Sequence, residues 1–177
     1  QMRLMEMLNF LPCIQLVSDG IEADDLISFV VQNHKYKGWQ KIIVSSDKDF
    51  FQLCDDETVV YRPIQKKFVN KPRILEEFGI HPTNFAMARA IAGDSSDNLK
   101  GVRGVGLKTI ANKLEFFSKE ESVTFDDLYE HCKNDNTGLK AFSSILENAD
   151  VIQENYKIMQ LYAPAISVQT KMKVQAS

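Results

Sequence analysis

The sequence predicts an α/β fold in which a parallel sheet is followed by a region that is almost entirely helical. Two short apolar runs, residues 13–17 and 41–46, are typical of buried strands, and a segment with helical periodicity at 22–36 lies between them. This strand, helix, strand order favours a parallel sheet. The length of 177 residues suits one domain, or a core with a smaller appendage.

The segments before Pro72 alternate between helix and strand. Apolar spacing at residues 2–8 suggests a helix that is already under way where the chain starts. After the strand at 41–46 we expect a short helix near 50–53. Residues 58–64 and 67–69 then predict two short extended segments that flank a turn.

From Pro72 onward the apolar spacing is helical. Phe78 precedes Gly79, which predicts a helix end, and Pro82 opens a further helix through Ile91. An apolar stripe from Leu107 to Phe117 predicts the next helix. Further helices are expected at 125–132, 139–147 and 149–162, with a weakly structured tail after residue 164.

Composition points to an ordinary globular protein of the cell interior. Hydrophobic residues make up 44% of the chain and charged residues 25%. No apolar run approaches the ~20 residues of a membrane helix, and no signal peptide precedes the first element, so we expect a cytoplasmic protein. Cys13, Cys54 and Cys132 are odd in number and widely spaced, which predicts buried, reduced thiols rather than disulfides or a zinc site.

The net charge of −3 conceals an uneven distribution of charge. Seven of the 24 acidic residues fall in three tight clusters, and the remaining 17 are outnumbered by the 21 basic residues. Between Lys100 and Lys119 five basic residues accompany the single acid Glu115. A locally basic surface beside a locally acidic pocket is therefore expected, and a nucleic-acid partner is compatible with the charge.

The three acidic clusters are the main candidates for chemistry. Taken singly, acids in such places are more often helix caps or turn residues than ligands, and acids in a first helical turn also stabilise the helix dipole. Three clusters together favour a shared function, because one or two acids would satisfy the structural role. The clusters consist of Glu22, Asp24 and Asp25, of Asp47 and Asp49, and of Asp94 and Asp97.

Convergence of these carboxylates would require counter-ions. Two carboxylates within ~4 Å repel by roughly 4 kcal/mol at an effective dielectric constant near 20, and divalent cations remove that cost. Sites made only of carboxylate oxygens select Mg²⁺ or Mn²⁺ over zinc, and His34, His81 and His131 lie outside the clusters. Two-metal hydrolysis of a phosphodiester is the chemistry that fits best.

A glycine-rich stretch at 99–110 precedes the apolar stripe. A loop that leads into a helix N-terminus aims backbone N–H groups at phosphate, and such contacts grip a nucleic-acid backbone without reading its bases. The alternative is a turn packed only for shape. The candidate DNA-binding residues are Arg103, Gly104, Gly106, Lys108, Thr109 and Lys113.

These motifs together resemble the 5′-nuclease superfamily. The resemblance rests on Glu-Ala-Asp-Asp, Ser-Ser-Asp-Lys-Asp-Phe and Gly-Asp-Ser-Ser-Asp-Asn, followed by Gly-Val-Arg-Gly-Val-Gly-Leu-Lys-Thr, in order over about residues 14–162. The nearest groups are phage 5′→3′ exonucleases with ribonuclease H or flap endonuclease activity, and the 5′-nuclease domains of bacterial DNA polymerase I.

The resemblance implies a PIN-like sheet and a helix-three-turn-helix element at about 93–118 that grips duplex DNA. It implies that Glu22, Asp24 and Asp47 hold a first metal ion, with Asp49 beside them, and that Asp25, Asp94 and Asp97 form a second group. Hydrolysis would leave a 5′-phosphate and a 3′-hydroxyl. Backbone carbonyls of Lys100, Val102 and Val105 would map to a K⁺ site, although Lys100 and Arg103 stand where many bacterial members have proline.

The sequence departs from the superfamily at its N-terminus. Members carry roughly a hundred further residues there, including a central strand with a metal-binding aspartate and a basic helical arch. We therefore expect a partial PIN-like catalytic region at 1–92, a helix-three-turn-helix and C-terminal helices at 93–165, and a tail at 166–177. The missing strand would leave an open sheet edge, which predicts a homodimer or completion by the N-terminal segment.

The resulting functional hypothesis is a Mg²⁺- or Mn²⁺-dependent, two-metal 5′→3′ exonuclease or flap endonuclease. It would act in replication and repair on duplex, flapped or nicked DNA and on RNA–DNA hybrids, in the cytoplasm, or in the host cytoplasm if encoded by a phage. The alternative is a non-catalytic duplex-binding fragment whose active site another chain completes. A PIN-like ribonuclease is a weaker third possibility, because it would need no glycine hairpin.

Overall fold

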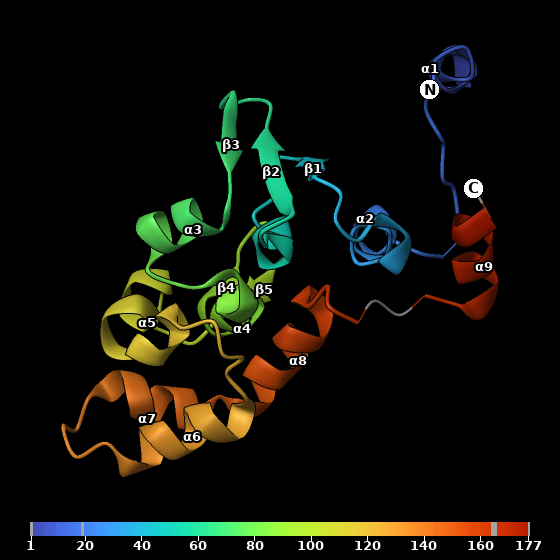
Figure 1. Cartoon of the computed structure of the whole chain (residues 1–177). Helices are drawn as coiled ribbons and strands as arrows, with labels where there is room; N and C mark the ends of the chain where they lie inside the picture. The colour runs from blue at the N-terminus through green and yellow to red at the C-terminus, as the bar shows by residue number, and fades with distance from the viewer. Residues whose placement is uncertain (1, 19, 164–165, 177) are drawn as a thin grey trace.

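The computed structural model describes residues 2–18, 20–163 and 166–176. It is a mixed α/β fold with small sheets and many helices (Figure 1). The α-helices of the described residues are α1 (Met2–Leu8), α2 (Ala23–Val31), α3 (Lys71–Phe78), α4 (Phe85–Ala92), α5 (Leu107–Lys113), α6 (Phe125–Asn134), α7 (Lys140–Glu147), α8 (Ala149–Met159) and α9 (Val168–Ala176). Short 3₁₀ turns lie at η1 (His34–Tyr36), η2 (Asp49–Leu53), η3 (Pro82–Asn84) and η4 (Glu115–Ser118).

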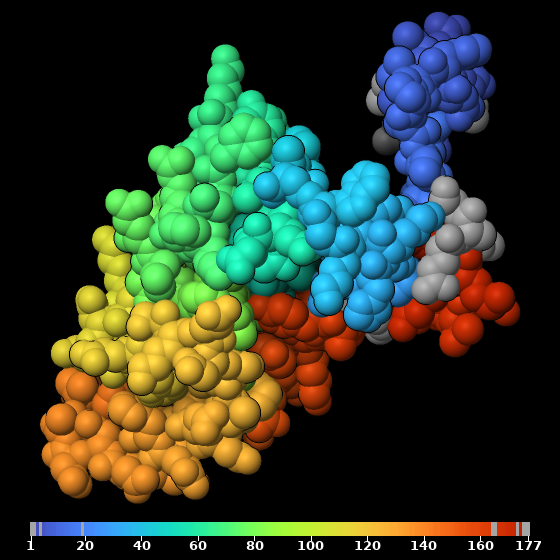
Figure 2. All heavy atoms as spheres, viewed as in Figure 1, coloured from blue at the N-terminus to red at the C-terminus, as the bar shows by residue number. Residues whose placement is uncertain are grey.

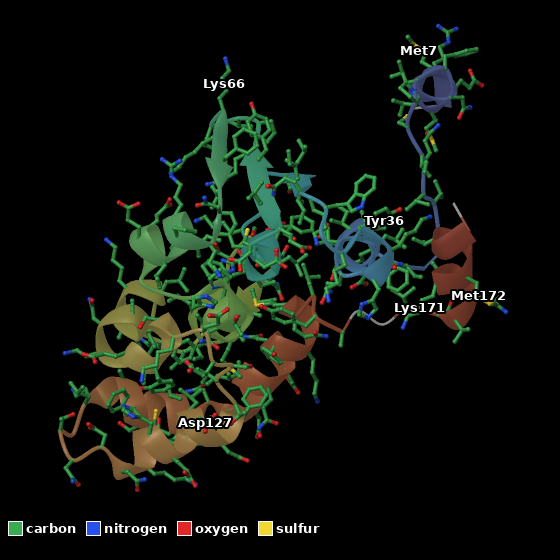
Figure 3. All side chains as sticks on the ribbon, viewed as in Figure 1. Met7, Tyr36, Lys66, Asp127, Lys171 and Met172 are labelled. Atoms are coloured by element: carbon green, nitrogen blue, oxygen red, sulfur yellow. The ribbon has the colours of Figure 1, made fainter. Side chains whose placement is uncertain are left out.

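The main sheet has three strands in the order β1–β2–β3, and a two-stranded ribbon pairs β4 with β5. The strands are β1 (Lys41–Val44), β2 (Thr58–Arg62), β3 (Lys67–Val69), β4 (Gly93–Asp94) and β5 (Leu99–Lys100). β1 runs parallel to β2, with Ile43 opposite Val60, and β2 runs antiparallel to β3, with Val60 opposite Val69. The hairpin of β2 and β3 confirms the two predicted extended segments, and Lys66 projects from its tip (Figure 3).

The prediction of a strand at residues 13–17 is wrong. These residues form no strand, and β1 takes β2 rather than this segment as its parallel partner. The segment runs past α9 toward α2 without pairing with β1 (Figure 1). Its Leu16 packs instead against a small apolar cluster built around Leu26, Ile166 and Val174. Only Leu16 of this run packs against helices, whereas Cys13, Ile14 and Val17 are exposed.

One large core holds the sheet and the helices after it together. Phe50 and Phe51 of η2, Phe85 of α4 and Phe117 of η4 are among its fully or almost fully buried side chains. The Phe51 and Phe85 rings meet edge to face at 5.5 Å. Figure 2 shows these segments as a continuous mass, whereas the residues around α1 project from it. The core therefore fixes η2 and α4 against each other.

Local signals account for the helix ends. Asn70 caps α3 by accepting a hydrogen bond from the Arg73 backbone N–H, and Gly79 ends the helix in the left-handed conformation at φ 67°. Thr124 and Asp127 form a capping box at the start of α6. These positions behave as their residue types predict.

Three further expectations need correction. The tail after residue 164 is predicted to be weakly structured, but α9 forms there and the side chain of its Thr170 bonds to Ser18 at 3.0 Å. The helix expected at 149–162 ends at Met159. Cys13 is exposed, whereas Cys54 and Cys132 are buried as expected. Residues 1, 19, 164, 165 and 177, which include the predicted start of the tail region, lie outside the described residues.

Among the described helices, none combines the length and the apolar character needed to cross a membrane.

Candidate metal and nucleic-acid site

Six of the seven predicted carboxylates line one pocket of about 350 Å³. They come from three separate segments: the start of α2, the loop after β1, and the turn between β4 and β5. Leu99 and residues 157–161, at the end of α8 and just beyond it, also line the pocket. The carboxylates of the pocket are Glu22, Asp24, Asp25, Asp47, Asp49 and Asp97.

The first cluster sits at the N-terminus of α2. Glu22 occupies the N-cap position, but its side chain makes no capping hydrogen bond. Asp24 and Asp25 lie in the first turn, where the helix dipole stabilises negative charge. Helix capping therefore does not account for a glutamate at position 22. Its carboxylate lines the pocket instead.

The second cluster follows directly from the end of β1. The Ser45 backbone N–H continues the ladder by donating to Tyr61 O at 3.0 Å. The Asp47 N–H then donates to Ser45 Oγ, and the Asp49 N–H donates to Asp47 Oδ1 at 2.8 Å. This tight turn brings both acidic residues to the carboxyl end of the parallel strand, where open sheets place their sites.

The seventh predicted carboxylate, Asp94, does not line the pocket but shares a hydrogen-bond donor, Arg89, with Asp49. Arg89 of α4 donates from Nε to Asp49 Oδ1 at 3.0 Å and from Nη2 to Asp94 Oδ2. One carboxylate oxygen each of Asp49, Asp94 and Asp97 lies within 4.8 Å of the others, a spacing that could hold a metal ion. The structure thus gathers all seven predicted carboxylates around one region.

Sequence reasoning missed Arg89 and Lys157, the latter a further lining residue of the acidic pocket. The signal for Arg89 is present in the sequence, because it is the charged residue in the otherwise apolar helix Phe-Ala-Met-Ala-Arg-Ala-Ile-Ala. A buried charge in such a helix requires a partner of opposite sign. Asp49, which precedes α4 in the sequence, and Asp94, which follows it, are the partners of Arg89.

The electrostatics of the pocket are those of a crowded acidic site. Burial raises the pKa of Asp24 above its ordinary value, and the charges of Asp47, Glu22, Asp25 and Asp97 add to the rise. Burial also raises the pKa of Asp49 to about 6, although the nearby Arg89 opposes this shift. These carboxylates hold their protons more tightly than exposed acids do, which is the behaviour expected where a cation belongs.

Asp94 differs from Asp49 although both bond to Arg89. Burial acts to raise the pKa of Asp94, but hydrogen bonds from Ser96 and the Arg89 guanidinium hold it below its ordinary value. The Ser96 N–H and hydroxyl donate to Asp94 Oδ1 at 2.8 and 2.5 Å. Donors aimed at a carboxylate favour its charged form.

The glycine-rich stretch forms a compact turn between α4 and α5. Its tightest contact lies at Gly101, where a Cβ atom would stand 2.1 Å from Ala92 O. Val102 and Val105 are buried and anchor the turn, and the Val102 N–H donates to Ile91 O at 2.8 Å.

The candidate DNA-binding side chains lie around this turn. Arg103, Lys108 and Lys113 are exposed, and within the described part of the chain none of them forms an ion pair. Gly104 and Gly106 are exposed as well, and Thr109 is half-buried. The turn therefore presents basic side chains to solvent, as phosphate contacts require.

One buried side chain connects the turn to the acidic region. Asn155 of α8 is 5% exposed and donates from Nδ2 to Ala90 O at 3.0 Å and to Lys100 O at 2.9 Å. Ala90 belongs to α4, beside Arg89, and Lys100 belongs to β5 of the turn. The basic turn and the acidic pocket are thereby held in a fixed relation.

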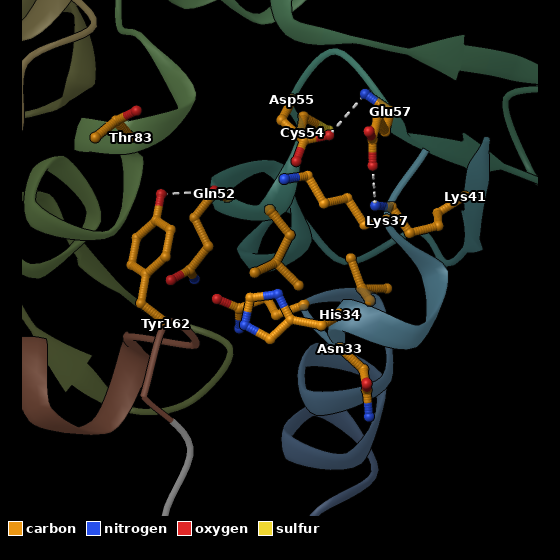
Figure 4. A pocket seen from close by; sticks show the side chains of 13 residues that line it. Asn33, His34, Lys37, Lys41, Gln52, Cys54, Asp55, Glu57, Thr83 and Tyr162 are labelled. Atoms are coloured by element: carbon orange, nitrogen blue, oxygen red, sulfur yellow. Dashed lines mark hydrogen bonds and ion pairs between the residues drawn. The ribbon is translucent and has the colours of Figure 1, made fainter. Parts of the chain in front are cut away.

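A second polar hollow lies between η1, η2 and the segment after α8 (Figure 4). Lys41 forms an ion pair with Glu57 at 2.8 Å at its edge, and the Tyr162 hydroxyl donates to Gln52 O at 2.6 Å. Its lining residues include His34 and Cys54 but none of the predicted site residues. The site predicted from the sequence is the acidic pocket and not this hollow.

Comparison with known proteins shows which proteins this chain resembles in sequence and in fold. Residues 2–79 match the family model described as the 5′-3′ exonuclease, N-terminal resolvase-like domain. The 5′-3′ exonuclease of Aquifex aeolicus is 34% identical over 113 residues, which are 64% of this chain and 38% of the relative. DNA polymerase I of Rhizobium leguminosarum is 33% identical over 151 residues, which are 85% of this chain and 14% of the relative.

Solved structures agree with the sequence matches. A phage T5 5′-exonuclease with bound divalent metal ions (zinc) has a TM-score of 0.77 at 19% identity, over 96% of this chain and 63% of that one. A phage T5 flap endonuclease variant, in a pseudo-enzyme–product complex with DNA and metal ions, has a TM-score of 0.75 at 19% identity. The chain is therefore similar to 5′-3′ exonucleases in sequence and to the phage T5 5′-exonuclease in fold. It spans less than two thirds of the length of each of these relatives.

Proposed function

We propose that this chain forms the metal-binding and duplex-gripping part of a divalent-metal-dependent 5′-nuclease. Its reaction would be hydrolysis of phosphodiester bonds, as a 5′→3′ exonuclease or flap endonuclease acting on DNA or RNA–DNA hybrids in replication and repair. The observation that carries the proposal is the meeting of six carboxylates from three distant segments in one pocket. The DNA and metal ions named for the phage T5 neighbour support the same substrate and cofactor class.

The donor set of the pocket suits Mg²⁺ or Mn²⁺. It offers carboxylate oxygens, and no histidine or cysteine lines the pocket among the described residues. We assign Glu22, Asp24 and Asp47 to a first ion, and Asp25, Asp94 and Asp97 to a second. Asp49 stands at the border, because its carboxylate also lies close to those of Asp94 and Asp97. Two bound ions would activate water and neutralise the phosphate.

The segment at 93–118 is proposed to act as a helix-three-turn-helix that grips the duplex backbone. Arg103, Lys108 and Lys113 would neutralise phosphates, and the backbone at Gly104 and Gly106 leaves room for their close approach. Thr109 would contribute a hydroxyl. A K⁺ ion would use the carbonyls of Lys100, Val102 and Val105, of which the first two already accept one hydrogen bond each from Asn155 and Val105.

The regional division proposed from the sequence assigns residues 1–92 to a partial PIN-like catalytic region and 93–165 to the DNA-gripping helices. The acidic pocket draws on both regions, since Asp97 lines it together with Asp47. The tail at 166–177 contains α9, which packs near α2 through Val174 and Leu26.

The free edge of β1 supports the proposal that another strand completes the sheet. Ile42 and Val44 of β1 are 52% and 67% exposed, and both line an apolar hollow with Leu16, Leu26 and Val30. Figure 2 shows the molecule hollowed between the β2–β3 hairpin and the N-terminal segment. Such an edge invites a strand from a preceding segment or from a second copy of the chain.

Cleavage of a 5′-flap duplex in Mg²⁺ tests the proposed function. We expect cleavage that stops with EDTA and with Asp47→Asn, and that continues with Asp126→Asn, which removes an exposed acid of α6 outside the pocket. Cleavage that survives Asp47→Asn would contradict the proposal.

The second candidate is a non-catalytic duplex-binding fragment that needs another chain to complete its active site. The exposed basic turn favours it independently of the pocket. It predicts duplex binding that weakens with salt and with Lys108→Ala, but not with Lys133→Ala, an exposed lysine on α6. Binding of this kind without any Mg²⁺-dependent cleavage would favour this candidate over the nuclease.

A further inference from the structure

Arg89 is a cation that contacts the carboxylates at the edge of the acidic pocket. Its helix neighbours Ala88 and Ala90 are fully buried, so the core holds its backbone in place. Its side chain is only 12% exposed and reaches Asp49 and Asp94, whose side chains are 16% and 11% exposed. The core thus holds the backbone of Arg89 in place, and the two carboxylates hold its guanidinium.

This contact divides the pocket into two electrically different halves. Asp49, Asp94 and Asp97 bring one oxygen each within 4.8 Å of the others, and the single positive charge of Arg89 contacts two of them. Glu22, Asp24 and Asp47, which are assigned above to the first ion, form no ion pair within the described residues, and neither does Asp25 of the second group. One half therefore already holds a guanidinium in direct contact, whereas the carboxylates assigned to the first ion have no ion-pair partner within the described residues, although Lys157 also lines the pocket.

The charge of Arg89 cannot be removed by deprotonation, because a guanidinium stays protonated in proteins. Arg89 takes up part of the acceptor capacity of Asp49 Oδ1 and Asp94 Oδ2, and Asp94 Oδ1 already accepts from Ser96, so a divalent ion that binds these two carboxylates competes with the guanidinium for their lone pairs. The ion would also lie close to a like charge in a partly shielded site, where repulsion is strong. The guanidinium and the ion therefore compete for these carboxylates.

Building on the proposed function, we propose that Arg89 is a positioning residue that makes the two halves of the pocket bind divalent ions with unequal affinity. The carboxylates without an ion-pair partner among the described residues, Glu22, Asp24 and Asp47, take the first ion tightly. The second group, which includes Asp94 and Asp97 with Asp49 beside them, takes the second ion weakly, because that ion must displace the guanidinium from Asp49, Asp94 or both. Arg89 thereby holds Asp49 and Asp94 in place until the second ion arrives.

Mn²⁺ titration of the whole chain, followed by electron paramagnetic resonance at fixed pH, tests this inference. The unchanged chain should show one tight and one weak class of sites. Arg89→Gln should tighten the weak class by at least ~10-fold, because the competing charge is gone, and should leave the tight class within about twofold. Arg89→Lys should keep the weak class weak, since it retains the charge.

Arg73→Gln is the matched control. It removes the same charge from a more exposed arginine of α3, which donates to Phe68 O rather than to a pocket carboxylate. Both classes of sites should be unchanged in this variant. Far-UV circular dichroism verifies that each variant is folded.

A measurement on the unchanged chain covers the case in which Arg89→Gln does not fold. The Arg89 Nε–H resonance should stay in place while Mg²⁺ fills the tight class and should shift as Mg²⁺ fills the weak class. A resonance that stays unmoved at full saturation would overturn the inference.

Two further results would also overturn it: equal affinities of the two classes in the unchanged chain, or a weak class that Arg89→Gln leaves unchanged or weakens. These failures are distinct from a failure of the proposed function. If the unchanged chain bound no Mn²⁺ at all, the proposed metal site would fall, and the inference about Arg89 would fall with it.

Discussion

At the scale of single residues, Asp49 carries an unusual free-energy cost in the metal-free chain. Its pKa of about 6 lies above the ordinary value of 3.8, so the folded chain binds this proton more tightly than the unfolded chain does. The resulting stability is fully present below about pH 4, is lost as the pH rises to about 6, and stays lost above that. The loss amounts to at most about 3 kcal/mol, since one pKa unit corresponds to about 1.4 kcal/mol.

Asp49→Asn should therefore flatten the pH dependence of the unfolding free energy between about pH 4 and pH 6. The neutral amide can still accept from Arg89, so the contact is kept while the titration is removed. Urea unfolding in EDTA across this range measures the effect, with Asp126→Asn as the control that keeps the original slope. An unchanged slope in Asp49→Asn would refute the assignment of this shift.

The three cysteines should differ sharply in reactivity. Burial raises the pKa of Cys54 to about 12 and that of Cys132 to about 11, whereas Cys13 is exposed. Because the thiolate is the nucleophile, a disulfide reagent at pH 7.5 should modify one thiol quickly and the other two only as the chain unfolds. Cys13→Ser should abolish the fast phase. Three equal rates in the native chain would contradict the burial of Cys54 and Cys132.

At the scale of elements, the turn between α4 and α5 tolerates a side chain at one glycine but not at another. A Cβ at Gly101 would meet Ala92 O at 2.1 Å, and backbone atoms cannot step aside as a flexible side chain does. Gly106 has φ −98°, and a Cβ added there would meet no atom within 4 Å among the described residues. Gly101→Ala should cost at least about 2 kcal/mol, and Gly106→Ala less than about 0.5 kcal/mol.

Chemical denaturation of the two glycine variants side by side measures this difference. Because both changes add the same methyl group to the same turn, the comparison removes effects of composition. Equal stabilities would show that the turn is looser than the contact between Gly101 and Ala92 implies.

Elements with local signals were predictable from the sequence. β1 was recognisable from its β-branched run, α3 from its glycine end, and the α6 start lay where the sequence placed it. Residues 13–17 and α9 were not, because their conformations depend on contacts with α2 that no local pattern reveals. The same applies to the site. The acidic clusters can be recognised in the sequence, but the roles of Arg89 and Asn155 could not be predicted, because both depend on hydrogen-bond partners that are distant in the chain.

At the scale of the whole molecule, the free edge of β1 predicts self-association of the isolated chain. Ile42 and Val44 expose apolar side chains beside a strand that, within the described residues, has a partner on one side only. Sedimentation at rising concentration should show dimers, and Val44→Lys should shift the equilibrium toward monomers, because a charge on an edge strand opposes pairing.

The matched control for this experiment is Ile64→Lys. Ile64 is 80% exposed in the turn between β2 and β3, away from β1, so the added lysine should leave association unchanged. A chain that stays monomeric at every concentration would rule out pairing through this edge.

The bridge made by Asn155 has a consequence for where a nuclease of this design would cut. Its two hydrogen bonds tie the helix that carries Arg89 to the strand that leads into the basic turn. If the chain acts as the proposed nuclease, the distance along the DNA between the basic turn and the cleaved bond is then fixed by this rigid connection. Product fragments would end at one nucleotide position, and Asn155→Ala would spread them into a ladder of neighbouring lengths.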